Sequence, residues 1–163
     1  MNSPYNGKFR VTQPRTATHD GLDLVGIDSK EIHATVTGVV KYAGWENPKD
    51  EKQGFGQYVC IESADKKYYY YGHLSEIRVK TGQIINICSV IGIEGSTGRS
   101  TGSHCHYCVR PVFAAGASLD VSAISGIPNA LGEYDDGYRP PTTDTHKIEL
   151  YIDGQKKYSG LID

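Results

Sequence analysis

Two histidines lie two residues apart in the segment SHCHYC, residues 103–108. On a β-strand, side chains at positions i and i+2 leave the same face of the strand, roughly 7 Å apart. This separation is too large for His104 and His106 to bind one metal ion comfortably. It suits one ligand together with one imidazole that reaches past the metal to a substrate. Taken alone, such a pair is more often two half-buried strand histidines, so a metal site needs donors from elsewhere in the chain.

Further metal donors lie in the segment THDGLDL, residues 18–24. It offers the imidazole of His19 and the carboxylates of Asp20 and Asp23, a set that suits zinc in a site with an open position. In an extended chain His19 and Asp23 would lie roughly 13 Å apart, so the chain must curl between them, as Gly21 permits. A helix would also bring these positions together, but Gly21 and the absence of a helical period disfavour it. From chemistry alone, Asp20 and Asp23 compete for the role of ligand.

The other histidines carry weaker signals. His73 follows the run Tyr70-Tyr71-Gly72, so it ends an aromatic strand at a glycine turn, from which an imidazole can overhang a sheet face. As an isolated observation this position is more typical of a capping or surface histidine. His33 and His146 lie in polar strand contexts, and we predict that they are structural or simply exposed.

Cysteines 105 and 108 have the spacing of half a zinc knuckle, but strand geometry disfavours that interpretation. Three residues apart on a strand, Cys105 and Cys108 leave opposite faces, and no second C-x-x-C completes a four-ligand cage. Cys108 shares the face of His104 and His106. We predict that all four cysteines of the chain are free thiols, as is usual for proteins made in the cytosol.

The chemistry-bearing residues must be positioned by β-structure. From residue 9 to about 112, short runs rich in Val, Ile, Thr and Tyr alternate with Gly and Asn, which predicts a mainly β, antiparallel sheet with a groove formed by loops. The predicted strands are Ile32–Tyr42, Tyr58–Ile61, Tyr68–Tyr71, Val90–Ile93 and His104–Val112. Residues 44–56 are polar and interrupted by Gly44, Pro48, Gly54 and Gly56, so we expect an exposed loop that could rim a cleft. Little helix is expected beyond one turn within residues 120–131.

The chain is predicted to form one domain with a tail. We assign residues 1–138 to the domain that carries the histidines, 139–146 to a linker, and 147–163 to a C-terminal β-hairpin with Asp153-Gly154 at its turn. An isolated hairpin is marginal in water, so this one should dock on the main sheet, pair with a second chain as a dimer contact, or begin a further domain.

Composition excludes several kinds of partner. The chain has 163 residues and a formal net charge of −2, which provides no global attraction to nucleic acid or anionic lipid. No apolar stretch approaches the roughly 20 residues of a membrane span, so we expect no membrane insertion. The N-terminal residues lack the apolar core of a signal peptide, which predicts that the protein is made in the cytoplasm and acts after its release from the cell. If a leader had been trimmed from the chain, an extracellular location would follow.

Taken together, three blocks resemble the lysostaphin-type (LytM-like) zinc endopeptidases, which cut peptide bonds in bacterial peptidoglycan. That family shows H-x-x-x-D early, aromatic-Gly/Ala-His-Leu in the middle, and G-x-T-G-x-x-T-G-x-H-x-H later. The corresponding segments here are His19–Asp23, Tyr71–Leu74 and Gly95–His106. The resemblance extends over about residues 9–112. The likeness is closest to phage-borne or prophage-borne endolysins of Gram-positive hosts.

The resemblance implies a site and a reaction. His19, Asp23 and His106 would bind one zinc ion, which selects Asp23 over Asp20, and His73 and His104 would be the catalytic imidazoles, as general base and oxyanion donor in an undecided order. Zinc with three protein ligands keeps an open position for water, whose pKa it lowers to about 7. The implied substrate is the peptide part of peptidoglycan, either stem peptide or cross-bridge.

Two features qualify the implied function. The alternative is a non-catalytic cell-wall-binding or regulatory module with the same fold, but such relatives typically lose ligands, and this chain retains all five key residues. Cys105 stands where the family commonly has an apolar residue, and Cys108 where Glu is frequent. Neither replaces a ligand, but thiols beside a metal site make it sensitive to oxidation.

Overall fold

The computed structural model describes residues 1–114, 116–139, 146–152 and 155–162. Within these ranges the chain is mainly β, as predicted, and every strand pairing is antiparallel. The strands before residue 140 are β1 (Lys8–Gln13), β2 (Leu22–Gly26), β3 (Glu31–His33), β4 (Gly38–Trp45), β5 (Gln57–Ser63), β6 (Tyr68–Gly72), β7 (Glu76–Ile77), β8 (Ile84–Ile85), β9 (Val90–Ile93), β10 (Cys105–Arg110) and β11 (Gly132–Asp135).

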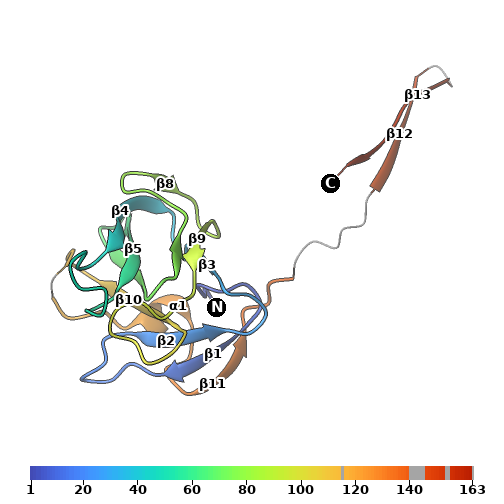
Figure 1. Ribbon diagram of the computed structural model, residues 1–163. Helices are drawn as coiled ribbons and strands as arrows, with labels where there is room; N and C mark the ends of the chain where they lie inside the picture. Colours follow the sequence, from blue (N-terminus) through green and yellow to red (C-terminus); the bar gives the residue numbers. More distant parts are fainter. Residues whose placement is uncertain (115, 140–145, 153–154, 163) are drawn as a thin grey trace.

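Eight of these strands form one sheet in the order β11-β1-β2-β10-β6-β5-β4-β8 (Figure 1). A smaller sheet in the order β3-β9-β7 packs against one of its faces, because Ile32 and Ile91 belong to the same buried cluster as Leu24, Tyr71 and Tyr107. This arrangement places the main core between the two sheets. The opposite face of the large sheet carries a separate, smaller aromatic cluster built on β5, β6 and β10.

Strand β10 shows how the two faces divide its side chains. Cys105, Tyr107 and Val109 are buried in the main core, whereas Cys108 lies in the aromatic cluster with Tyr70. This alternation follows from the period of two in a β-strand. It confirms that Cys105 and Cys108 leave opposite faces, as their spacing predicts. All four cysteines are free thiols in the structure.

The run from Ile32 to Tyr42, predicted as one strand, is divided into β3 and β4. Between them the backbone N–H of Thr35 donates to the hydroxyl of Tyr71 at 2.9 Å. The Thr35 hydroxyl lies 2.6 Å from that of Tyr71 and 2.8 Å from that of Tyr107. Both tyrosines are fully buried, and buried hydroxyls require hydrogen-bond partners. Thr35 supplies them from outside the strand ladder, which is why the prediction of one continuous strand was wrong.

The short helix α1 (Val121–Ser125) confirms the turn predicted within residues 120–131. Asp120 caps its start by accepting hydrogen bonds from the N–H groups of Ser122 and Ala123. Gly126 ends it with φ of 75°, a conformation that favours glycine. Within the described residues, no helix has the length and apolar character needed to cross a bilayer.

The C-terminal strands β12 (His146–Ile152) and β13 (Gln155–Ile162) pair with each other, in the register expected of the predicted hairpin. The predicted turn residues Asp153 and Gly154, and most of the linker predicted at 139–146, lie outside the described residues. The division into domain, linker and hairpin stays a prediction.

Candidate metal centre

Neighbouring strands bring Asp23 and His106 together. In the antiparallel ladder of β2 and β10, Asp23 is the direct register partner of His106. Directly paired residues place their side chains on the same face of a sheet, close together. Accordingly, Nδ1 of His106 donates a hydrogen bond of 2.8 Å to Oδ1 of Asp23. Both residues are buried, so sheet register alone fixes this half of the site.

His19 reaches the same carboxylate from the loop before β2. A turn forms in which the N–H of Thr16 donates to the carbonyl of His19 at 2.9 Å, and the N–H of His19 donates to Oγ1 of Thr16 at 3.1 Å. The ring is then oriented by Nδ1, which donates to the carbonyl of Pro14 at 3.0 Å, so that Nε2 lies 3.1 Å from Oδ1 of Asp23. The chain curls without forming a helix here, as predicted.

Two groups of side chains have the composition and spacing of metal ligands. His19, Asp23 and His106 offer donor atoms within 4.8 Å of one another, and so do Asp20, His106 and Cys108. The first group is the better cation site, because Asp20 in the second is already paired at 2.6 Å with the guanidinium of Arg110. The structure therefore brings together the three side chains that were predicted to be ligands.

The charges around Asp23 favour its ionised form. Burial on its own would raise the pKa of the Asp23 carboxyl, but the hydrogen bond from His106 and the nearby imidazoles of His104 and His19 lower that pKa below its usual value. Burial likewise opposes protonation of His106, but the hydrogen bonds to Asp20 and Asp23 outweigh it and raise the pKa of His106 well above its usual value. Asp23 is thus a carboxylate surrounded by nitrogen donors.

His73 is held in a left-handed conformation beside these ligands. Its φ is 63°, unusual for a residue other than glycine. Two hydrogen bonds secure it: the backbone N–H donates to the carbonyl of Phe55 at 2.7 Å, and Nδ1 donates to the carbonyl of Thr97 at 2.7 Å. Burial lowers the pKa of His73 to about 4. The imidazole is therefore neutral at pH 7, with its proton on Nδ1 and Nε2 basic.

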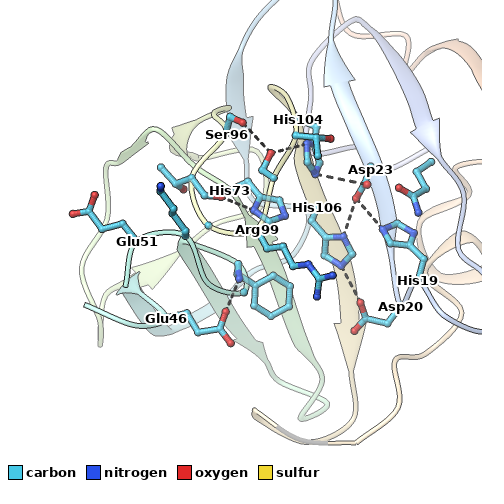
Figure 2. A pocket seen from close by; sticks show the side chains of 18 of the residues that line it. His19, Asp20, Asp23, Glu46, Glu51, His73, Ser96, Arg99, His104 and His106 are labelled. Atoms are coloured by element: carbon cyan, nitrogen blue, oxygen red, sulfur yellow. Dashed lines mark hydrogen bonds and ion pairs between the residues drawn. The ribbon is translucent and has the colours of Figure 1, made fainter. Parts of the chain in front are cut away.

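His104 lies just before β10 and forms an isolated β-bridge with Gly95. The strand predicted at His104–Val112 is thus shorter at both ends and runs from Cys105 to Arg110. Nδ1 of His104 donates to the carbonyl of Gly102 at 2.8 Å, while Nε2 lies 3.7 Å from Oδ2 of Asp23. The rings of His73 and His104 are 4.6 Å apart between centroids. Figure 2 shows both imidazoles beside Asp23 and His106.

These five side chains line one cleft of about 1260 Å³. One wall is the loop predicted at residues 44–56, although Gly44 and Trp45 belong to strand β4. The other wall is the glycine-rich segment 95–102. The N–H of Gly98 donates to the carbonyl of Glu51 at 2.9 Å, and that of Arg99 donates to the carbonyl of Gly54 at 2.9 Å, so these two segments are hydrogen-bonded to each other.

Two features of the site were missed by sequence reasoning. One is Thr97, whose hydroxyl accepts from the N–H of Gln57 and donates to the carbonyl of Leu74 while its own carbonyl orients His73. The other is the contact of Asp20 with His106 and Arg110. The threonine was visible in the glycine-rich motif, but the Asp20 contacts depend on the pairing of β2 with β10, for which no local signal exists.

Of the two histidines predicted to be structural or exposed, His33 lies apart from these five. His33 is buried, with Nε2 3.2 Å from the side-chain amide of Asn6. His146 begins strand β12. His33 does not line the cleft.

Two imidazoles and a carboxylate converging in an open cleft, with two more imidazoles beside them, are typical of metal-dependent hydrolases. The chain belongs to Peptidase family M23, whose family profile matches residues 17–120. DD-carboxypeptidase/endopeptidase Mpg of Neisseria meningitidis is 32% identical over 110 residues, which are 68% of this chain and 24% of that protein. Peptidoglycan DD-endopeptidase ShyA of Vibrio cholerae is 34% identical over 135 residues, 74% of this chain and 30% of that protein.

Solved structures show the same fold. The catalytic domain of the prophage-encoded protein EnpA from Enterococcus faecalis is 28% identical with a TM-score of 0.61, over 72% of this chain and 93% of that chain. The catalytic domain of lysostaphin from Staphylococcus simulans is 26% identical with a TM-score of 0.60, over 73% and 91% respectively. The chain spans about a quarter to a third of the length of Mpg and ShyA, but nearly the whole of these two catalytic domains.

Proposed function

We propose that this protein is a zinc-dependent endopeptidase that hydrolyses peptide bonds in the stem peptides or cross-bridges of bacterial peptidoglycan. The observation that carries the proposal is the convergence of His19, Asp23 and His106 within 4.8 Å at a cleft that also presents His73 and His104. Membership of Peptidase family M23 supports the reaction class. The name of the relative ShyA, a peptidoglycan DD-endopeptidase, supports the substrate.

The donor set fits one zinc ion. Two imidazole nitrogens and one carboxylate oxygen are a common ligand set of catalytic zinc sites, which keep a further position open. His19 would bind through Nε2 and His106 through Nδ1, since these atoms both face Oδ1 of Asp23. When bound, zinc supplies a Lewis acid that makes water acidic at neutral pH and polarises a carbonyl group.

The two remaining imidazoles move protons in the proposed reaction. Because Nδ1 of His73 and Nδ1 of His104 each donate to a backbone carbonyl, Nε2 is the nitrogen of each ring that can act as a base. An imidazole in this state can accept a proton at Nε2 as the nucleophile attacks, and can then donate it from Nε2 to the oxyanion or the departing amine. The low pKa of His73 keeps its Nε2 available at neutral pH.

The substrate would lie in the cleft, in contact with both wall segments. The loop that includes Glu46 and Glu51 and the segment that includes Arg99 both line it, so the wall residues, and not the buried ligands, would select the peptide. We place the site of action at the cell wall, where such peptides occur. No large basic surface is needed for a peptide substrate, in keeping with the net charge of −2.

Mass spectrometry of fragments released from purified cell walls tests the proposal. Walls with several types of cross-bridge are incubated with the zinc-loaded chain, with and without a chelator. We expect new peptide ends from at least one wall type and their loss after chelation. If no wall type released peptides, the chain would be a binding or regulatory module instead; release unaffected by the chelator would contradict the metal-dependent mechanism.

A further inference from the structure

The four imidazoles of the cleft are each oriented by a hydrogen bond from the ring nitrogen that faces away from the proposed metal position. In three of them the acceptor is a backbone carbonyl, and in the fourth it is a side-chain carboxylate. The bonds are His19 Nδ1 to Pro14 O at 3.0 Å, His73 Nδ1 to Thr97 O at 2.7 Å, His104 Nδ1 to Gly102 O at 2.8 Å, and His106 Nε2 to Asp20 Oδ1 at 3.1 Å. The orientation of the His106 ring therefore depends on a side chain, which a substitution can remove.

Asp20 is itself held in place. Its second oxygen, Oδ2, accepts a hydrogen bond of 2.6 Å from Nη2 of Arg110. The guanidinium of Arg110 in turn lies over the rings of Phe55 and Tyr70, 5.4 Å and 5.2 Å from their centroids. A planar cation stacked on aromatic faces is a rigid support. Arg110 thus holds Oδ2 of Asp20 in place while Oδ1 faces His106.

The backbone next to Asp20 is shaped for this contact. A Cβ atom at Gly21 would lie 2.8 Å from Nε2 of His106 and 2.6 Å from the carbonyl oxygen of Tyr107. Any larger residue at Gly21 would push the loop away from β10. Glycine therefore allows the segment that carries Asp20 to approach the outer edge of the His106 ring.

We propose that Asp20 is a positioning residue for the metal ligand His106, an inference that rests on the proposed zinc site. By accepting a hydrogen bond from Nε2–H, Asp20 keeps the proton of the zinc-bound ring on Nε2 and leaves the lone pair of Nδ1 for the metal; it also turns Nδ1 toward Asp23 and His19 (Figure 2). Asp20 does not bind the metal: it lies on the opposite edge of the ring from Asp23 and is neutralised by Arg110.

A carboxylate in this position strengthens metal binding through the ligand it touches. It holds the ring in the productive orientation and raises the basicity of the coordinating nitrogen, and loss of such a partner typically weakens metal binding about 10–100-fold. The arrangement also assigns separate duties to the two carboxylates of the segment HDGLD. Asp23 is the ligand and Asp20 orients its neighbour.

The test compares zinc affinities in the full chain by competition with a chelator, with zinc alone as the probe. We expect Asp20→Ala to bind zinc about 10–100-fold more weakly than the unmodified chain. Asp20→Asn keeps an oxygen that can accept from Nε2, so it should recover most of this loss, to within about tenfold. The control Asp65→Ala removes an exposed carboxylate from the turn between β5 and β6, and it should bind zinc like the unmodified chain.

A second readout reports on the ring itself. In zinc-loaded protein labelled with ¹⁵N, the unmodified chain should show His106 as the tautomer with its proton on Nε2, and Asp20→Ala should lose the slow exchange of that proton. Cobalt substitution should give absorption spectra of the same ligand number for both proteins, because Asp20 is not a ligand. Thermal unfolding of the metal-free variants checks that the fold is retained; if Asp20→Ala does not fold, the position of the His106 proton in the zinc-loaded unmodified chain carries the test.

Three results would overturn the inference: zinc affinity of Asp20→Ala equal to that of the unmodified chain, a proton on Nδ1 of His106 in the zinc-loaded protein, or zinc retained by Asp23→Ala but lost by Asp20→Ala. Failure of the proposed function is distinguishable from these. A chain that binds zinc in an Asp20-dependent manner but releases nothing from cell walls would refute the endopeptidase and leave the role of Asp20 intact.

Discussion

The proposed ligands and the proposed catalytic imidazoles are held by two different kinds of structure. Asp23 and His106 are register partners on adjacent strands β2 and β10 near the middle of the sheet. His73 and His104 follow a strand end and a loop, and hydrogen bonds to the carbonyls of Thr97 and Gly102 orient them. In the proposed enzyme, the sheet thus determines where the metal would be bound, whereas loop backbone determines where protons would be moved.

This difference teaches that metal binding and catalysis can be lost separately. Changes on the strand side should remove the metal and the activity together. Changes on the loop side should leave the metal in place and reduce turnover or stability. The following substitutions test this division.

The largest effect is expected from His106→Ala on the strand side. Loss of a residue that only orients a metal ligand weakens metal binding by up to roughly 100-fold. Loss of the proposed ligand itself should weaken zinc binding by more than this, and activity should disappear with the metal. Zinc content after dialysis and peptide release from cell walls measure both losses. A His106→Ala protein that keeps stoichiometric zinc would show that another set of residues binds the metal.

His104→Ala should produce the opposite pattern on the loop side. The three ligands remain, so zinc should stay bound, while loss of a positioned acid–base group should lower kcat by about 10²–10⁴-fold. Metal analysis and kcat on the same preparation make the comparison. Full activity in His104→Ala would contradict the catalytic role of this imidazole, and loss of zinc would contradict the separation of the two regions.

Gly98→Ala should weaken the junction between the two cleft walls. Gly98 has a φ of 74°, and a Cβ there would lie 2.2 Å from the backbone nitrogen of Gly56. We expect the free energy of unfolding to fall by about 2–3 kcal/mol, measured by urea denaturation. Gly102→Ala is the matched control in the same segment, because nothing lies within 4 Å of its added Cβ, and its change should stay within about 0.5 kcal/mol. Equal effects would mean that the two walls do not depend on this contact.

The smallest expected effect concerns pH. Folding lowers the pKa of His73 from its ordinary 6.5 to about 4, because the ring is buried. The unfolded chain then binds the proton more readily than the folded chain. The contribution of His73 to the free energy of unfolding is therefore fully present above pH 6.5 and is lost as the pH falls from 6.5 toward 4. As the pH falls from 6.5 to 4, the free energy of unfolding of the chelator-treated chain should decrease by roughly 1–2 kcal/mol more than that of His73→Asn, after allowance for solvent screening.

Asparagine suits this comparison because it tolerates the left-handed backbone of His73 without adding a titratable group. Urea denaturation at a series of pH values gives the difference. Parallel stability curves for the two proteins across this range would show that His73 is not neutral through burial.

Local sequence patterns were sufficient for the elements whose signals lie within a few residues. The alternation along β10 separated Cys105 from Cys108, and the same period predicted that His104 and His106 would face one cleft. The curl at Gly21 followed from the distance that His19 must cover to reach Asp23. These features depend on strand period and chain length, which are local.

Other features depend on which strands meet, and no local signal shows that. The break at Thr35 arises because two buried tyrosine hydroxyls, from β6 and β10, need a partner. The contact between Asp20 and His106 exists only once β2 lies beside β10. The choice of Asp23 over Asp20 came from family resemblance and not from geometry, because both carboxylates follow His19 closely in sequence.

The register between β2 and β10 has a further consequence for how this protein can be prepared. A slip of one residue in that pairing would turn the carboxylate of Asp23 to the opposite face of the sheet, away from His106. With the proposed ligands, a molecule that retains zinc is therefore one whose central strands have paired correctly. The ratio of bound zinc to protein would then serve as a direct count of natively folded molecules in a refolded sample.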